Sequence, residues 1–187
     1  FNVSTFTART ITSSLSDIHG AITGAIASLK GPLHGGANEE VMHMMNKIKK
    51  PENALKWINN ALSKKEVVMG FGHRVYKSGD SRVPTMEKYF KNVSKIKSDK
   101  KFIKIYNIVK KVMIDKKNIH PNVDYPTGPT YHLMGFDTDF FTPIFVTSRI
   151  TGWSAHIMEQ HAANKLIRPL SKYSGQKHRK VMLLNQR

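Results

Sequence analysis

Apolar residues recur at intervals of three and four along most of this chain, whereas runs of alternating polar and apolar residues are nearly absent. A period of three to four residues places the apolar side chains on one face of a helix, so the pattern favours an all-α fold. The first apolar stripe predicts one long helix over residues 3–29, ended by Gly31-Pro32. Its members are Ile11, Leu15, Ile18, Ile22, Ile26 and Leu29.

Further apolar stripes predict helices that begin near Asn38, Pro51 and Pro84, and a last helix that carries Trp153. Asn38 is a candidate N-cap, because its side-chain oxygen can accept a hydrogen bond from a free backbone N–H group. Proline suits the first turn of a helix, where no N–H group is needed.

The composition excludes several classes of protein. With 40% hydrophobic and 23% charged residues over 187 positions, the chain can bury a core, so disorder along the whole chain is not expected. No apolar run reaches the roughly 18 residues of a transmembrane helix. The lack of cysteine excludes disulfides, thiolate zinc sites and cysteine nucleophiles. The histidines have no recognised ligand spacing, so no metal is expected.

The charge of the chain is strongly positive. Lys and Arg number 30 against 13 Asp and Glu, a formal net charge of +17. Residues 88–117 hold eleven lysines among apolar residues at helical spacing, which favours solvated outer faces of amphipathic helices. A polyanionic partner is the alternative, but no nucleic-acid-binding motif accompanies the lysines, so no specific nucleic acid is expected.

Arginines are scarce beside these lysines, which makes their positions informative. Arginine is favoured where a planar fork must hold a carboxylate or a phosphate through two donors. The seven arginines are Arg9, Arg74, Arg82, Arg149, Arg168, Arg179 and Arg187. The last two lie in a polar tail, so the first five are the candidates for binding an anion.

Three polar groups stand in glycine- or proline-rich turns between the predicted helices. They are His34, His73 with Arg82, and Asp124, which falls in a proline-flanked loop expected over residues 121–126. Turns at helix ends often carry functional side chains. Each group alone is weak evidence for a functional site, because a single histidine or aspartate in a turn is more often a surface or capping residue.

Taken together, the segments around these groups resemble the citrate synthase family. The matching segments are GPLHGGAN at 31–38, GFGHRVY at 70–76, PNVD at 121–124 and FTPIF through SR at 141–149. GDSRVP at 79–84 and DYPTGP at 124–129 are most similar to the bacterial 2-methylcitrate synthase and citrate synthase branch, although many family members have proline where this chain has Ser81. The resemblance covers all but the last dozen residues.

The resemblance implies a Claisen-type condensation of an acyl-CoA with oxaloacetate, followed by hydrolysis of the thioester. Propionyl-CoA would give 2-methylcitrate and acetyl-CoA would give citrate, and the branch-like segments favour the former. By resemblance, Asp124 is the base that removes a proton beside the thioester, His34 the donor to the thioester oxygen, and His73 the donor to the ketone of oxaloacetate. Such a reaction needs a base and a donor where negative charge develops. Acyl-CoA is a co-substrate, and no permanently bound cofactor is expected.

The resemblance also assigns residues that bind the substrates. Arg82, Arg149 and Arg168 match the family's carboxylate-binding arginines, and Arg168 would reach the active site of the neighbouring subunit in a homodimer. The main chain against which CoA lies is matched by Val68, Met69, Gly70, Phe71 and Gly72. Arg74 or Lys77 would meet the CoA phosphates, with a plain surface cation as the alternative.

The family fold implies two helical domains that close over the substrates. Residues 1–35 would belong to the large domain, 36–135 would form the small domain, and 136–187 would complete the large one. The helix over residues 3–29 would pack in the dimer interface, or it is an ordinary buried helix, and periodicity does not separate these two interpretations.

The chain opens at Phe1, just after the point where the family has a further oxaloacetate-binding histidine. We therefore expect a C-terminal fragment that is inactive alone. The alternative is a truncated, non-catalytic product with nonspecific affinity for nucleic acid, which salt would weaken. The expected compartment is the bacterial cytoplasm, with the mitochondrial matrix as the alternative, and no membrane association is expected.

Overall fold

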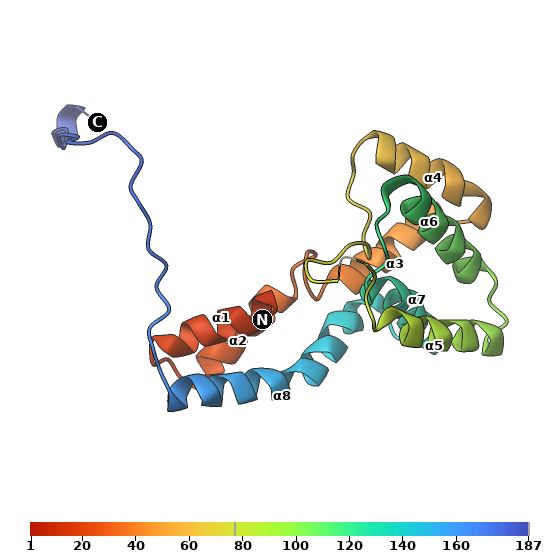
Figure 1. The fold of residues 1–187 in the computed structure, drawn as a ribbon, viewed down its shortest axis with the longest axis horizontal. Coiled ribbons are helices and arrows are strands. Elements are labelled where there is room, and N and C mark those ends of the chain that lie inside the picture. The colour runs from red at the N-terminus through yellow and green to blue at the C-terminus, as the bar shows by residue number, and fades with distance from the viewer. Residues whose placement is uncertain (77, 187) are drawn as a thin grey trace.

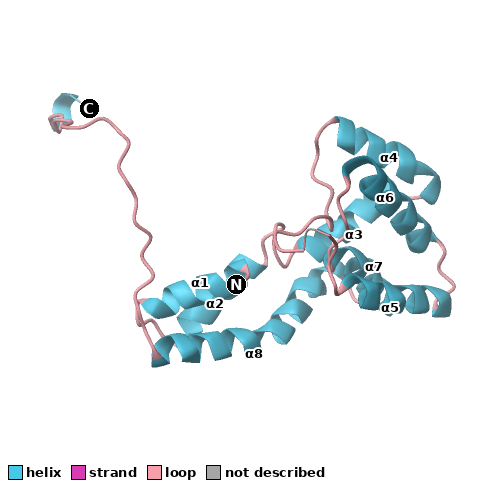
Figure 2. Ribbon diagram, in the orientation of Figure 1, coloured by secondary structure: helices cyan, strands magenta, loops and turns pink. Residues whose placement is uncertain are grey.

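A computed structural model describes residues 1–76 and 78–186 and shows them as helices joined by turns and loops (Figure 2). The elements are α1 (Val3–Ser13), α2 (Ile18–Leu29), α3 (Ala37–Ile48), α4 (Pro51–Ser63), α5 (Val83–Ile96), α6 (Lys101–Lys117), α7 (Asp124–Met134), η1 (Thr138–Phe140), α8 (Phe141–Ala162) and η2 (Leu184–Gln186). In this part of the chain the only β pairing is an isolated bridge between Phe71 and Pro121. The expected all-α class is confirmed.

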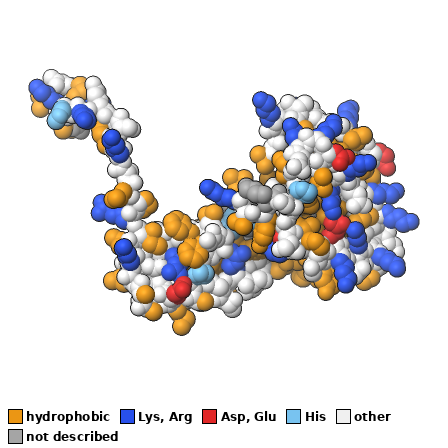
Figure 3. Space-filling view, viewed as in Figure 1, with side chains coloured by type: hydrophobic (Ala, Val, Ile, Leu, Met, Phe, Trp, Pro, Cys, Tyr) orange, Lys and Arg blue, Asp and Glu red, His pale blue; other side chains and the backbone are white. Residues whose placement is uncertain are grey.

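Helices α3 to α7 pack around one hydrophobic core (Figure 1). Its largest fully buried side chains include Met42, Ile58, Phe90, Tyr106 and Tyr125. The rings of Tyr106 and Tyr125 stack with their centroids 4.5 Å apart, and the Tyr125 hydroxyl donates to the Tyr106 carbonyl at 3.0 Å. Lysine and arginine side chains lie on the outer surface of helices α3 to α7 (Figure 3), as expected for solvated helix faces.

Helices α1, α2 and α8 form a second core that is separate from the first. Small residues line the contact between α1 and α2, so the two helices approach closely. A Cβ atom added at Gly24 would lie 2.2 Å from the Ile11 Cδ1 atom, which shows how little room remains there. The fully buried Trp153 of α8 packs against Ala8 and Ala21 in the same core.

Helix α8 takes part in both cores. Phe141 at its start is buried in the core of α3 to α7, whereas Trp153 and Ile157 are buried against α1 and α2. The Glu39 carboxylate of α3 accepts the backbone N–H of Thr142 at 3.0 Å, which satisfies one of the free donors at the start of α8. Helix α8 and the short turn over residues 30–36 therefore join the two bodies (Figure 1).

The single helix expected over residues 3–29 is wrong, because the chain breaks after Ser13. Leu15 has a φ of 66°, a left-handed conformation that ends a helix. Asp17 then caps α2 by accepting the Gly20 N–H group at 2.7 Å. An apolar stripe at spacings of three and four continues across this break, so periodicity alone does not reveal two antiparallel helices.

Two local expectations at helix starts also need correction. Asn38 is not an N-cap: α3 begins at Ala37, with Gly36 before it, and the Asn38 side chain accepts the N–H of Glu39. The loop expected over residues 121–126 ends early, because α7 begins at Asp124. Pro126 fits there because a proline in the first helical turn loses no hydrogen bond.

The tail after α8 runs away from the helices, as Figure 1 shows. Arg168 and most of its neighbours are exposed, and Leu170 is 98% exposed. None of the helices described is both long enough and apolar enough to cross a membrane.

The cap at Asp17 provides a test of the break between α1 and α2. Replacing Asp17 by Ala is expected to lower the free energy of unfolding by about 1 kcal/mol, because the Gly20 N–H group loses its acceptor. Urea unfolding of the 187-residue chain measures this change. Asp17→Asn keeps a capping oxygen and is the control. An Ala variant as stable as the Asn variant would contradict a helix start at this position.

Candidate active site

One cavity of about 570 Å³ brings together segments that are far apart in the sequence. Residues 1–3, 32–34 and 67–75 contribute to its wall, together with Asn122 and Asp124. His34, His73 and Asp124 all line it, and so do the five residues Val68 to Gly72. The structure therefore gathers the three groups that the sequence singled out, each from a different segment.

His34 is held by the start of α1. The Ser4 N–H group lies 3.3 Å from the His34 Nε2 atom and donates to it, and the Ser4 hydroxyl is 2.8 Å from the same atom. The buried Trp153 indole donates to the Ser4 hydroxyl at 3.2 Å. Because a backbone N–H group can only donate, Nε2 is the acceptor and the imidazole proton lies on Nδ1.

The surroundings of His34 favour the neutral imidazole. Burial lowers its pKa, and the positive charge of Arg149 lowers it further. A protonated ring would also oppose the Ser4 N–H group at the helix N-terminus. His34 is thus a neutral donor through Nδ1, which has no hydrogen-bond partner among the residues described.

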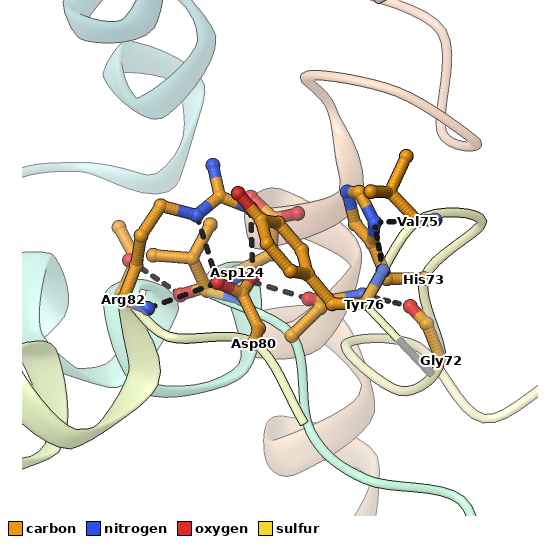
Figure 4. A network of polar contacts seen from close by, with 10 residues as sticks. Gly72, His73, Val75, Tyr76, Asp80, Arg82 and Asp124 are labelled. Carbon is orange, nitrogen blue, oxygen red and sulfur yellow. Dashed lines mark hydrogen bonds and ion pairs between the residues drawn. The ribbon is translucent and has the colours of Figure 1, made fainter. Parts of the chain in front are cut away.

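His73 is fixed in the opposite tautomer. Its Nδ1 atom accepts the backbone N–H groups of Val75 at 3.1 Å and Tyr76 at 3.2 Å. In the neutral ring the proton therefore lies on Nε2. The Tyr76 ring packs against the imidazole with centroids 4.6 Å apart. Figure 4 shows the two backbone contacts of this ring.

Asp124 is the first residue of α7 and is half-buried in the cavity wall. Burial raises its pKa to about 6; the positive charge of Arg82 opposes this rise, and the negative charge of Asp80 adds to it. A carboxylate with a raised pKa is a stronger base than an exposed one, so Asp124 is suited to removing a proton near neutral pH.

Arg82 is bound to a carboxylate of its own chain (Figure 4). Its Nε and Nη2 atoms donate to the two oxygens of Asp80 at 2.9 and 2.6 Å. The Arg82 side chain is 47% exposed, whereas that of Asp80 is fully buried. Sequence reasoning missed Asp80; the signal was an aspartate two residues before an arginine in a glycine-containing turn.

Arg149 on α8 is half-buried, and its Nη1 atom is buried without a hydrogen-bond partner among the residues described. Burial lowers its pKa, and so does the nearby positive charge of Arg82. Two guanidinium groups that repel each other, one with an unused donor, form a region that favours an anion.

The remaining predicted cations are placed differently. Arg168 lies in the exposed tail and does not line the cavity. Arg74 is exposed at the cavity edge. Lys77 and Arg187 lie outside the described residues. Arg9, for which no role was assigned, joins α1 to α8 through Glu159 and the carbonyl of His156. In residues 1–76 and 78–186, no three His, Asp or Glu side chains gather as a metal site.

Comparison with known proteins identifies the family. The family model for the citrate synthase C-terminal domain matches residues 1–170. This chain belongs to the citrate synthase family. The match includes every cavity residue discussed above.

The relatives of this chain include both enzymes of the branch. The 2-methylcitrate synthase 2 of Corynebacterium glutamicum is 57% identical over 187 residues, all of this chain and 49% of that protein. The citrate synthase of Mycolicibacterium smegmatis is 57% identical over 97% of this chain and 48% of that protein. The chain thus spans about half the length of the curated relatives it matches.

Solved structures of citrate synthases share the fold. The ternary complex of the Thermoplasma acidophilum citrate synthase with carboxymethyl coenzyme A and oxaloacetate matches with a TM-score of 0.91 and 37% identity. The match covers all of this chain and 51% of that chain. The Thermotoga maritima citrate synthase matches with a TM-score of 0.88.

The raised pKa of Asp124 makes stability depend on pH. In the folded chain the Asp124 carboxyl keeps its proton up to about pH 6, whereas an aspartate in the unfolded chain releases its proton near pH 4. Stability is therefore lost as pH rises from about 4 through 6. Replacing Asp124 by Asn removes the free-energy cost of ionising a buried carboxyl. The variant is therefore expected to be more stable than wild type by about 1–3 kcal/mol at pH 8 and equal to it at pH 4.

Urea unfolding of the 187-residue chain at the two pH values measures this difference. Asp115→Asn, at an exposed aspartate of α6, is the control and is expected to behave as wild type at both pH values. An Asp124→Asn variant that is no more stable than wild type at pH 8 would show that Asp124 ionises freely in the folded chain.

Proposed function

We propose that this chain forms part of an enzyme that condenses an acyl-CoA with oxaloacetate and then hydrolyses the thioester. The observation that carries the proposal is the single cavity lined by His34, His73 and Asp124. It supplies two imidazoles whose neutral tautomers donate through opposite nitrogens, and one carboxylate whose pKa is about 6. A base and two oxygen-directed donors are what this condensation requires.

In the first step, Asp124 removes a proton from the carbon beside the thioester. Negative charge then develops on the thioester oxygen, where the Nδ1–H of His34 donates a hydrogen bond. A neutral donor suits this position, because it stabilises the enolate without first losing hydration as an imidazolium would. The proton taken by Asp124 is available for return later in the cycle.

In the second step, the carbon nucleophile attacks the ketone carbon of oxaloacetate. A carbon–carbon bond forms, and the ketone oxygen takes the proton of His73 Nε2 as it becomes a hydroxyl. The proton that Asp124 removed in the first step then replaces the one lost from His73, so both groups return to their starting states. Water then attacks the thioester carbonyl and the carbon–sulfur bond breaks. The products are CoA and a tricarboxylate, which is citrate from an acetyl group or 2-methylcitrate from a propionyl group.

Two arginines support the dicarboxylate part of the proposal. We assign one carboxylate of oxaloacetate to Arg82 and the other to Arg149, whose Nη1 atom is buried without a hydrogen-bond partner in residues 1–76 and 78–186. A dianion would relieve the repulsion between the two guanidinium groups. Arg168 would act from the tail of a second copy in a homodimer, in keeping with its exposed position away from the cavity of its own chain.

The acyl-CoA would lie along residues 68–72, which line the cavity. A second, mainly apolar cavity of about 370 Å³ shares Val67, Val68 and Phe71 with the first. Lys65 and Lys117 stand at its edge. This neighbouring space suits the flat adenine of CoA, with the lysines near its phosphate groups, and Arg74 is a further cation for the phosphates.

The two cores support a division into domains. We propose that residues 36–135, with the core of α3 to α7, form the small domain and that residues 1–35 and 136–187 belong to the large one. His34 stands at the boundary, and Asp124 and His73 stand on the small-domain side. Closure of one domain on the other would bring the groups together and exclude water.

The identity of the acyl donor decides which of the two tricarboxylates forms. Relatives at 57% identity carry both names, 2-methylcitrate synthase and citrate synthase. The two donors differ by one methyl group, which an apolar pocket distinguishes by only about 1–3 kcal/mol. We propose a 2-methylcitrate synthase that also accepts acetyl-CoA.

A chimera tests this proposal. The N-terminal half of the Corynebacterium glutamicum relative is joined ahead of this chain, and release of CoA from propionyl-CoA and acetyl-CoA is measured with oxaloacetate. We expect turnover with both donors and the larger kcat/KM with propionyl-CoA. The 187-residue chain is assayed in parallel and is expected to be inactive alone.

Variants of the chimera test the role of Asp124. Asp124→Ala is expected to lower kcat by at least about a hundredfold, because the base is lost, while oxaloacetate binding measured by calorimetry stays nearly unchanged. Asp115→Ala is the control and should keep wild-type turnover. Wild-type kcat in the Asp124→Ala chimera would exclude Asp124 as the base.

A further inference from the structure

The Asp80 carboxylate accepts four hydrogen bonds, although it lies in a turn. Its side chain is fully buried, and four donors reach its two oxygens. Three belong to Arg82: the backbone N–H at 3.0 Å, Nε at 2.9 Å and Nη2 at 2.6 Å. The fourth is the backbone N–H of Val123, at 3.1 Å, from a segment 43 positions away.

The contact with Asp80 orients the guanidinium of Arg82 and does not use all of its donors. Nε–H and one Nη2–H form the fork that Asp80 occupies. An arginine has five N–H donors, so the fork between Nη1 and Nη2 remains for a second carboxylate. The Tyr76 ring lies 5.4 Å from the Arg82 Cζ atom and limits movement of the plane on one side.

The contact with Val123 places the start of α7. Val123 immediately precedes Asp124, the first residue of that helix. The Asp124 backbone N–H is held in turn by the Asn122 side chain at 3.0 Å. One buried carboxylate thus joins the turn that carries Arg82 to the turn that carries Asp124, as the dashed lines of Figure 4 show.

We propose that Asp80 is a positioning residue for the condensation, through which the dicarboxylate-binding arginine and the proton-abstracting aspartate share one support. The proposal rests on the function proposed above. In this role Asp80 touches neither substrate. It holds Arg82 through Nε and Nη2, so that the Nη1 side can meet a substrate, and it fixes the start of the helix that carries Asp124.

The charges of this group agree with that role. Burial alone would raise the pKa of Asp80, but the hydrogen bonds from Arg82 outweigh it and hold the pKa below its usual value, so Asp80 stays ionised. Its negative charge contributes to the raised pKa of Asp124, which Arg82 opposes. Asp80 therefore keeps Asp124 a stronger base than it would be beside an unpaired arginine.

Titration of Asp124 by carbon-13 NMR in the 187-residue chain tests the effect of Asp80 on Asp124 and does not require enzymatic activity. Asp80→Asn keeps the size of the side chain and an oxygen for Val123, but removes the charge. We expect the pKa of Asp124 to fall from about 6 towards that of an ordinary aspartate. Asp115→Asn is the matched control and should leave the titration of Asp124 unchanged.

A second variant keeps the test decisive if Asp80→Asn fails to fold, which circular dichroism would reveal. Arg82→Gln removes the opposing positive charge, so the pKa of Asp124 is expected to rise. Shifts of opposite sign in the two variants support the proposal, and so does the Arg82→Gln shift alone if the other variant is unfolded. A folded variant in which the Asp124 titration does not move would overturn it.

Kinetics of the chimera supply the functional readout. Asp80→Asn is expected to raise the KM for oxaloacetate by about tenfold or more, because Arg82 is no longer oriented, and to move the acidic limb of the pH–kcat profile to lower pH. A general loss of stability would lower the amount of active enzyme without moving that limb, and this result would overturn the proposal. A wild-type chimera without turnover would refute the proposed function, whereas the NMR titration judges the support itself.

Discussion

Backbone N–H groups donate to one ring nitrogen of each cavity histidine, and the chemistry of the site depends on this constraint. Ser4 at the start of α1 donates to Nε2 of His34, and Val75 and Tyr76 donate to Nδ1 of His73. A main-chain donor cannot reverse its direction, so each ring has one possible tautomer when neutral. The fold thereby gives each imidazole, when neutral, one N–H group that can donate, and it places both rings and the Asp124 carboxylate in the wall of one cavity.

The arrangement of the two cores explains why that cavity forms where it does. Helices α1, α2 and the end of α8 hold the His34 turn, while α3 to α7 hold His73 and Asp124. His34 and His73 stand on segments between helices, and Asp124 is the first residue of α7, so all three stand in loops or at a helix start, where side chains can meet a ligand. The turn before α5 also carries the buried Asp80 carboxylate, whereas Arg149, whose Nη1 atom has no hydrogen-bond partner among the described residues, lies on α8.

Helical periodicity was enough to predict the all-α class and most helix positions, because each helix buries one stripe. It failed between Ser13 and Ile18, where a left-handed Leu15 and an Asp17 cap break a stripe that continues across the turn. The cavity residues were predicted from segments that resemble a family, since nothing in spacing alone brings positions 34, 73 and 124 together. Asp80 and Ser4 were not predicted, because their roles arise from contacts between distant segments.

A crystal structure of the chimera with oxaloacetate and carboxymethyl coenzyme A, the pair bound by the Thermoplasma acidophilum citrate synthase, tests the central claim most directly. The carboxymethyl group is expected between His34 Nδ1 and Asp124, with the oxaloacetate ketone against His73 Nε2 and its carboxylates on Arg82 and Arg149. An analogue whose carboxymethyl group lies away from His34 and Asp124 would contradict the assignment of this cavity as the place of reaction.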